Sequence, residues 1–113
     1  MRICGDTCAT KLIFEVAFLT DEEIATLTKI CCECGVTYVK TATGSQAFPD
    51  VNQVKIMKAN LSGNTKIKVS GVPRTFTLQA ALYLFNELGV SLVGTRSAGK
   101  LVEEYEKYLQ EKQ

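Results

Sequence analysis

The stretch VTYVKTATG, residues 36–44, decides the fold prediction. It begins as an alternation of β-forming residues and ends in a lysine, two threonines and a glycine. Because side chains alternate along a strand, Lys40 shares a face with Tyr38 and lies opposite Val39. A lysine buried near the end of a strand must be paired or neutral, and a neutral lysine attacks carbonyl carbon. The residues therefore allow two interpretations, a Schiff-base lysine or a surface lysine with its ammonium in water.

The rest of the chain alternates predicted strands and helices. Hydrophobic runs predict strands at 11–19, 36–41, 65–70 and 90–95, and helical spacing predicts helices at 21–34, at 51–60, before Gly89 and after Gly99. Strands that alternate with helices in this way form parallel sheets through crossover connections. No Pro- or Gly-rich linker divides the sequence, so we expect residues 1–113 to form a single α/β domain.

The helix at 21–34 is the most strongly marked element. Thr20 and Glu23 form a predicted capping box, and Gly35 is placed to end the helix. Its predicted apolar face carries isoleucine and leucine together with Cys31 and Cys34, where cysteine acts as a small hydrophobe.

Composition excludes several classes of protein. The chain has 113 residues, with 13 basic and 12 acidic residues interspersed along it and a net charge of +1. This balance argues against nucleic acid or a membrane surface as a partner. No apolar run approaches the roughly 20 residues of a membrane span, and the first residues lack the apolar core of a signal peptide. We therefore expect a cytoplasmic location.

The five cysteines are Cys4, Cys8, Cys31, Cys32 and Cys34. Without a secretory context, reduced thiols are the expectation. A structural zinc site is the alternative, but the chain contains no histidine and two of the cysteines fall on a predicted apolar helix face. We predict no metal.

Chemistry-bearing residues follow the predicted strands. Glu15 interrupts the first strand, Lys40 and Lys68 lie near the ends of the second and third, and GTRS (94–97) ends the fourth. In parallel α/β folds the working residues lie at these strand ends. Two neighbouring ammonium groups raise the cost of charging each other, so one lysine can be neutral near pH 7. The alternative is two unrelated surface lysines.

Three motifs carry a resemblance to a known family. VKTATG (39–44), KVSGVPRT (68–75) and VGTRS (93–97) resemble the last three strand ends of deoxyribose-phosphate aldolase, a class I aldolase with a (β/α)8 TIM barrel. KLIFE (11–15) resembles the strand before them. The resemblance implies a half-barrel of about four βα units, the C-terminal half of such an enzyme. It also implies cleavage of 2-deoxyribose 5-phosphate to glyceraldehyde 3-phosphate and acetaldehyde, with no cofactor.

The resemblance also implies roles for individual residues. Lys40 stands where the family places the Schiff-base lysine, and Lys68 stands where it places the lysine that lowers the pKa of the first. Glu15 is expected to be a polar neighbour of the lysines. The implied phosphate-binding loops contain Gly44 with Ser45, Gly71 with Val72, and Arg96 with Ser97.

The sequence departs from the family pattern in the loop of Val72 and Pro73, at Arg96, and, most of all, in its length. Val72 replaces a glycine, Pro73 replaces an aliphatic residue and removes an N–H group, and Arg96 replaces a small hydroxyl residue. A whole barrel needs about 250 residues, and the acid of the family's proton relay lies on an earlier strand.

These departures leave alternatives open. One is a non-catalytic half-barrel that acts as a binding module, and another is a phosphate-binding domain of flavodoxin-like topology. The expected partners are a phosphorylated sugar and either a second copy of the chain, in a homo-oligomer, or a complementing half-barrel.

Overall fold

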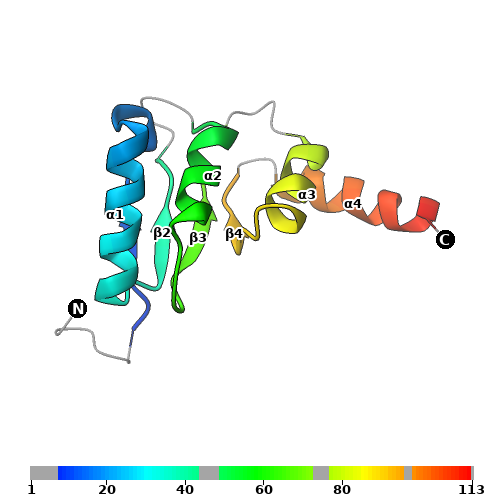
Figure 1. Ribbon diagram of the computed structural model, residues 1–113. Helices are drawn as coiled ribbons and strands as arrows, with labels where there is room; N and C mark the ends of the chain where they lie inside the picture. The colour runs from blue at the N-terminus through cyan, green and yellow to red at the C-terminus, as the bar shows by residue number, and fades with distance from the viewer. Residues whose placement is uncertain (1–7, 44–48, 73–76, 96–97, 113) are drawn as a thin grey trace.

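The computed structural model describes residues 8–43, 49–72, 77–95 and 98–112. Strands and helices alternate along the chain, as the sequence predicts (Figure 1). The elements are β1 (Lys11–Ile13), a 3-10 turn (Val16–Phe18), α1 (Asp21–Cys34), β2 (Tyr38–Lys40), α2 (Val51–Ala59), β3 (Lys66–Val69), α3 (Leu78–Asn86), β4 (Leu92–Val93) and α4 (Ala98–Lys112).

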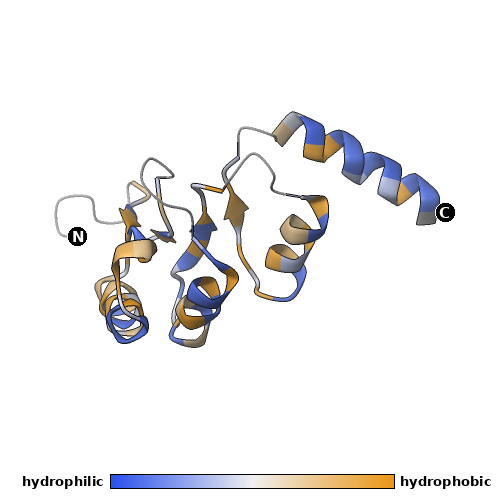
Figure 2. Ribbon diagram, turned by 90° about the horizontal axis from the view of Figure 1, so that it is seen from above, coloured by the Kyte–Doolittle hydropathy of each residue, from blue (hydrophilic) through white to orange (hydrophobic). Residues whose placement is uncertain are grey.

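The four strands form one parallel sheet in the order β1-β2-β3-β4. Figure 2 shows α1, α2 and α3 on one side of this sheet. Strands in chain order with helices on one face are half of a closed (β/α)8 barrel, whose other face would line the barrel interior. The predicted α/β half-barrel is confirmed.

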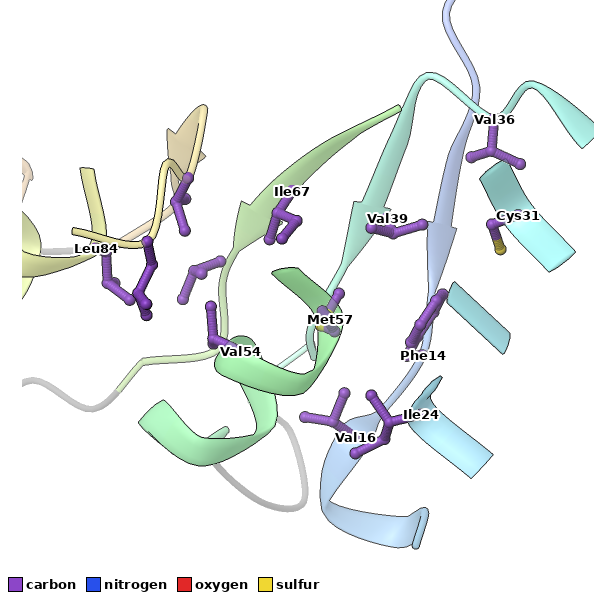
Figure 3. Packing of buried hydrophobic residues seen from close by; sticks show 13 residues of the cluster. Phe14, Val16, Ile24, Cys31, Val36, Val39, Val54, Met57, Ile67 and Leu84 are labelled. Atoms are coloured by element: carbon purple, nitrogen blue, oxygen red, sulfur yellow. The ribbon is translucent and has the colours of Figure 1, made fainter. Parts of the chain in front are cut away.

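The hydrophobic core lies between the sheet and the helices. Val39 and Ile67 project from β2 and β3 to the helix side, where Met57 of α2 packs among them (Figure 3). All three side chains are fully buried. Since alternate residues of a strand face opposite sides, the lysines and the tyrosine that flank these valine and isoleucine positions face away from the core.

The caps of α1 confirm the predicted helix. The Glu23 N–H donates to Thr20 Oγ1 at 3.1 Å, and the Thr20 N–H donates to Glu23 Oε1 at 2.8 Å. Gly35 follows the helix with φ 75°, a conformation that glycine adopts at little cost. An equivalent box formed by Asp50 and Gln53 starts α2.

The predicted strand at 11–19 is wrong beyond Ile13. The Phe14 N–H donates to the Lys40 carbonyl, and the Val16 N–H donates to the Thr41 carbonyl. Between these two bonds the chain after β1 advances by two residues, while the chain at the end of β2 advances by one. Glu15 is the extra residue and adopts a left-handed conformation with φ 52°. This is the geometry of a bulge, which ends the regular ladder and bends the chain into the 3-10 turn.

The predicted apolar face of α1 is wrong in part. Cys31 is buried, as expected, but Ile30 is 49% exposed and Cys34 is exposed. The buried stripe is the narrower set of Ile24, Thr28 and Cys31, because α1 meets the sheet along one line. Burial, together with the neighbouring Cys32 and Cys34, raises the pKa of the Cys31 thiol.

The described residues also bear on metal binding and on membrane insertion. Within the described ranges, no group of three or more cysteine, aspartate or glutamate side chains is placed to hold a metal ion. Cys4 lies outside those ranges. No helix in the same part of the chain is long and apolar enough to cross a membrane.

Candidate functional site

The site is built on the pairing of β2 with β3. Lys40 and Lys68 are partners in the parallel register, so their side chains leave the same face of the sheet from adjacent strands. Both side chains are partly buried. Adjacent strands lie about 4.8 Å apart, which places the two lysine stems side by side. The predicted common face of the two lysines is confirmed.

Lys68 has a perturbed pKa. Burial lowers the pKa of its ammonium from the ordinary value of 10.5, and the charges of Lys11 and then Lys40 lower the pKa further. The Lys68 side chain passes beside Gly94, where a Cβ atom would lie 3.5 Å from Lys68 Cε, an ordinary van der Waals contact. The neutral form of Lys68 is therefore favoured by desolvation and by like charge.

A hydroxyl network joins the strands just beyond the lysines. Thr41 Oγ1 donates to the Ser70 carbonyl at 2.9 Å and accepts from the Ser70 N–H at 3.1 Å. Ser70 Oγ donates to the Ala42 carbonyl at 2.7 Å. All three residues are buried, so these bonds satisfy backbone groups that the diverging strands would otherwise leave unpaired. The network fixes the separation of the strand ends that carry the two lysines.

Glu15 lies at the end of β1 and binds backbone. Its Oε1 accepts from the Thr43 N–H at 2.9 Å. Its Oε2 is buried without a hydrogen-bond partner among the described residues. In that part of the chain no ion pair joins Glu15 to Lys40 or Lys68, so the carboxylate orders the segment after the lysine strand.

The predicted phosphate loops are only partly described. Gly44, Ser45, Arg96 and Ser97 lie outside the described residues. Gly71 directly follows Ser70 and has φ 75°, which a residue with a side chain would adopt only with strain. Val72, which replaces a glycine of the family pattern, is partly buried and packs against the hydrophobic core. The valine therefore has a structural role.

Sequence reasoning missed three residues of the site. Thr41 and Ser70 belong to the predicted strand ends, but their mutual bonding depends on the register. Lys11 pairs with Tyr38 in register, and its Nζ lies 5.6 Å from the centre of the tyrosine ring. The alternation in β1 could have placed Lys11 on the lysine face once the register with β2 was known.

These features define a parallel α/β half-barrel with two lysines at neighbouring strand ends. A closely spaced lysine pair in a partly buried setting can supply a neutral amine, which attacks aldehydes and ketones. The chemistry that this lysine pair supports is therefore amine chemistry.

Comparison with known sequences identifies the relationship. The chain is 34% identical over 96 residues to the deoxyribose-phosphate aldolase of Aquifex aeolicus, covering 84% of this chain and 42% of that protein. It is 36% identical over 107 residues to the Mycoplasma pneumoniae deoxyribose-phosphate aldolase, covering 94% and 46%. The chain is thus similar in sequence to part of these deoxyribose-phosphate aldolases, as the motifs predicted. No family model matches it.

Solved structures agree with the sequence comparison. An aldolase designated QR15 superposes with a TM-score of 0.77 at 30% identity, covering 91% of this chain and 46% of that one. A Coccidioides immitis protein described as a candidate deoxyribose-phosphate aldolase superposes with a TM-score of 0.80 at 26% identity, covering 93% and 42%. The chain spans less than half the length of the relatives it matches.

Proposed function

We propose that this chain supplies the Schiff-base centre of a class I aldolase that cleaves 2-deoxyribose 5-phosphate to glyceraldehyde 3-phosphate and acetaldehyde. The observation that carries the proposal is the in-register pair of Lys40 and Lys68 on the face that would line a barrel interior. The relationship to deoxyribose-phosphate aldolases supports the choice of substrate.

The proposed reaction begins when the neutral amine of Lys40 attacks C1 of the open-chain sugar. Loss of water gives a protonated imine. A base then removes the proton of the 3-hydroxyl, the C2–C3 bond breaks, and its electron pair moves into the imine to form an enamine. Glyceraldehyde 3-phosphate leaves, the enamine takes a proton at carbon, and water hydrolyses the imine to release acetaldehyde and the amine.

Lys68 is assigned the supporting role. Its proximity to Lys40 in the sheet makes two simultaneous ammonium ions costly, which favours one neutral amine near pH 7. A specific observation also supports the reverse assignment, because the lowered pKa is that of Lys68. In that second candidate, Lys68 is the nucleophile and Lys40 supplies the neighbouring charge.

Borohydride trapping tests the proposal. Acetaldehyde forms an imine with the reactive lysine, and borohydride reduces it to a stable ethyl group that intact mass and peptide mapping locate. We expect one ethyl group at Lys40. Labelling spread evenly over exposed lysines, such as Lys29 and Lys55, would contradict a Schiff-base centre. A single label at Lys68 would favour the reverse assignment.

The other function to weigh is a non-catalytic half-barrel that binds without turnover. A folded protein that resists trapping at every lysine, tested both alone and with the remaining half of a relative's barrel, would support this candidate.

A further inference from the structure

Three lysine side chains converge on the face of the sheet that is turned away from the core. Lys40 and Lys68 leave adjacent strands at the same register, and Lys11 lies in the neighbouring row of side chains, opposite Tyr38. Lys11 Nζ lies 5.6 Å from the centre of the Tyr38 ring, so this side chain leans from β1 over β2. The lean brings a third ammonium group toward the lysine pair.

The pKa of Lys68 agrees with this geometry. Burial is the largest cause of its lowered pKa, and the charge of Lys11 comes next, ahead of the charge of Lys40. Because the interaction of two charges falls with distance, Lys11 is an electrostatic neighbour of Lys68 although the two lysines lie on different rows and on strands that do not pair.

No acid in the described part of the chain forms an ion pair with these three lysines. Glu15, at the end of β1, directs its Oε1 to the Thr43 N–H, and its Oε2 is buried without a hydrogen-bond partner among the described residues. The net charge of the chain is only +1. The positive charge of the lysine face is therefore local, and acids such as those in the first turn of α1 balance it from elsewhere.

The other groups on this face add positive charge or none. Lys66 of β3 pairs with Tyr38 in register and is exposed. On β4, Leu92 pairs with Lys68 in register, and Gly94 lies beside Lys68 Cε. Lys68 therefore has cationic neighbours on β1, β2 and β3, and β4 contributes no charge to the face.

Such a cluster attracts anions. Side chains of one sign raise the local concentration of counterions, and an anion between ammonium groups relieves their mutual repulsion. A monovalent anion balances one of the three charges, whereas a divalent anion balances two. Each lysine carries three N–H donors on a flexible stem, and three stems from three strands suit the oxygen atoms of a tetrahedral anion.

We propose that Lys11, Lys40 and Lys68 form a binding site for a divalent tetrahedral oxyanion, the chemistry shared by free phosphate and by the terminal group of a phosphate monoester. The bound anion favours the ammonium form of the lysines. If the aldolase function proposed above holds, on which this consequence rests, the anion opposes imine formation. A sugar phosphate bound in this way presents its phosphate group to the amine instead of its C1 carbon, so the complex is unproductive.

Titration of the isotope-labelled chain by nuclear magnetic resonance tests the site without requiring activity. Sulfate is the first probe because it stays divalent across the pH range used, and chloride of equal ionic strength is the reference. We expect saturable shifts of the backbone amides of Lys11, Lys40 and Lys68. Shifts that never saturate, or that are equally large at the exposed lysines Lys29 and Lys55 of the helices, would reduce the effect to general screening and overturn the proposal.

A matched pair of variants tests the third lysine. Lys11→Gln and Lys29→Gln each remove one charge from an exposed lysine. Lys11→Gln should weaken sulfate binding by on the order of tenfold, and Lys29→Gln should leave it unchanged. Binding by the wild type should also weaken as the pH rises toward 10.5, because Lys68, whose pKa is lowered, loses its proton below that value. Equal affinities of the two variants would overturn the proposal.

Two further arms separate the sources of the anion and the proposed function. Inorganic phosphate and glycerol 3-phosphate should both shift the Lys11 amide; tighter binding of the ester identifies a phosphate monoester as the ligand, and equal binding identifies the free anion. Saturating sulfate should slow borohydride trapping with acetaldehyde. A chain that binds sulfate at Lys11 but is trapped at no lysine retains the anion site and loses the aldolase function. A chain that is trapped at the same rate with and without saturating sulfate overturns the proposed competition.

Discussion

Thr41 and Ser70 bond to each other twice across neighbouring strands, through one hydroxyl that both donates to and accepts from the Ser70 backbone. Thr41 directly follows Lys40 at the end of β2, and Ser70 lies two residues after Lys68, just past the end of β3. Their buried bonds hold the strand ends together at the point where the regular ladder stops, so the spacing of the lysines depends on a threonine hydroxyl.

Thr41→Val should therefore destabilise the protein. Valine has nearly the same shape, but it leaves the Ser70 N–H and C=O groups buried without these partners, at a cost of about 1–3 kcal/mol. Urea denaturation followed by circular dichroism measures the change. Thr26→Val on the exposed side of α1 makes the same chemical change and should cost much less. Equal losses in the two variants would show that the hydroxyl network contributes little.

Lys40→Arg should abolish borohydride trapping, because a guanidinium does not form an imine under these conditions. Lys68→Leu should still be trapped at Lys40, but only at higher pH, since the neighbouring positive charge that favours the neutral amine is lost. Peptide mapping across a pH series distinguishes the variants. If Lys40→Arg is still fully trapped and Lys68→Leu is no longer trapped, then Lys68 is the nucleophile and Lys40 has the supporting role.

The stability of the protein should depend on pH through Lys68. The pKa of Lys68 is lower in the folded state than the ordinary 10.5. At a pH between the folded-state pKa and the unfolded-state pKa, the unfolded chain binds more protons than the folded protein. The free energy of unfolding therefore rises with pH across that interval. Lys68→Met removes this contribution. The variant should be more stable than the wild type near pH 7, and the difference should shrink as the pH approaches 10.5.

Chemical denaturation at several pH values measures this difference. Lys29→Met, on the exposed side of α1, corrects for the loss of a surface lysine. A stability difference between Lys68→Met and wild type that stays constant or grows as the pH rises would refute the expected sign.

Glycine at position 15 should be tolerated better than alanine. Both substitutions lose the hydrogen bond to the Thr43 N–H. Alanine is also strained in the left-handed conformation, which glycine adopts freely. The Glu15→Gly variant should therefore be more stable than the Glu15→Ala variant by about 1 kcal/mol. At Lys29, in the middle of α1, the order should reverse, because glycine is the poorer helix former by about 1 kcal/mol. Thermal unfolding of the four variants provides the comparison.

Phosphate should stabilise the fold if the implied phosphate-binding loops, which include Gly71, bind the anion. At a phosphate concentration 100 times the dissociation constant, the expected gain is about 2.7 kcal/mol. Thermal unfolding in phosphate and in chloride of equal ionic strength measures it. The absence of a shift would favour the non-catalytic half-barrel.

The predictable features were those that local chemistry specifies. Thr20, Glu23 and Gly35 fix both ends of α1 within the helix itself. The alternation within each strand places Lys40 opposite Val39, and Lys68 opposite Ile67 and Val69. The parallel order followed from repeated alternation of strands and helices. In each case the interacting residues are close together in the sequence, or the pattern of residues repeats with a fixed period. Such features can be inferred without the tertiary structure.

The features that sequence reasoning missed depend on tertiary geometry. Glu15 takes a left-handed conformation because the two strands fall out of step there, and nothing in a glutamate indicates a positive φ. Ile30 is exposed because α1 contacts the sheet along a narrow line, which helical spacing cannot locate. The network formed by Thr41 and Ser70 appears only when the strands are in register.

The strand order has a consequence for biosynthesis. Lys11 pairs with Tyr38, Tyr38 with Lys66, and Lys68 with Leu92, so each strand bonds to the one made next. Every crossover closes within a few tens of residues, and loop closure over such distances costs little entropy. The sheet can consequently grow one unit at a time as the polypeptide leaves the ribosome, in the manner of a tandem repeat.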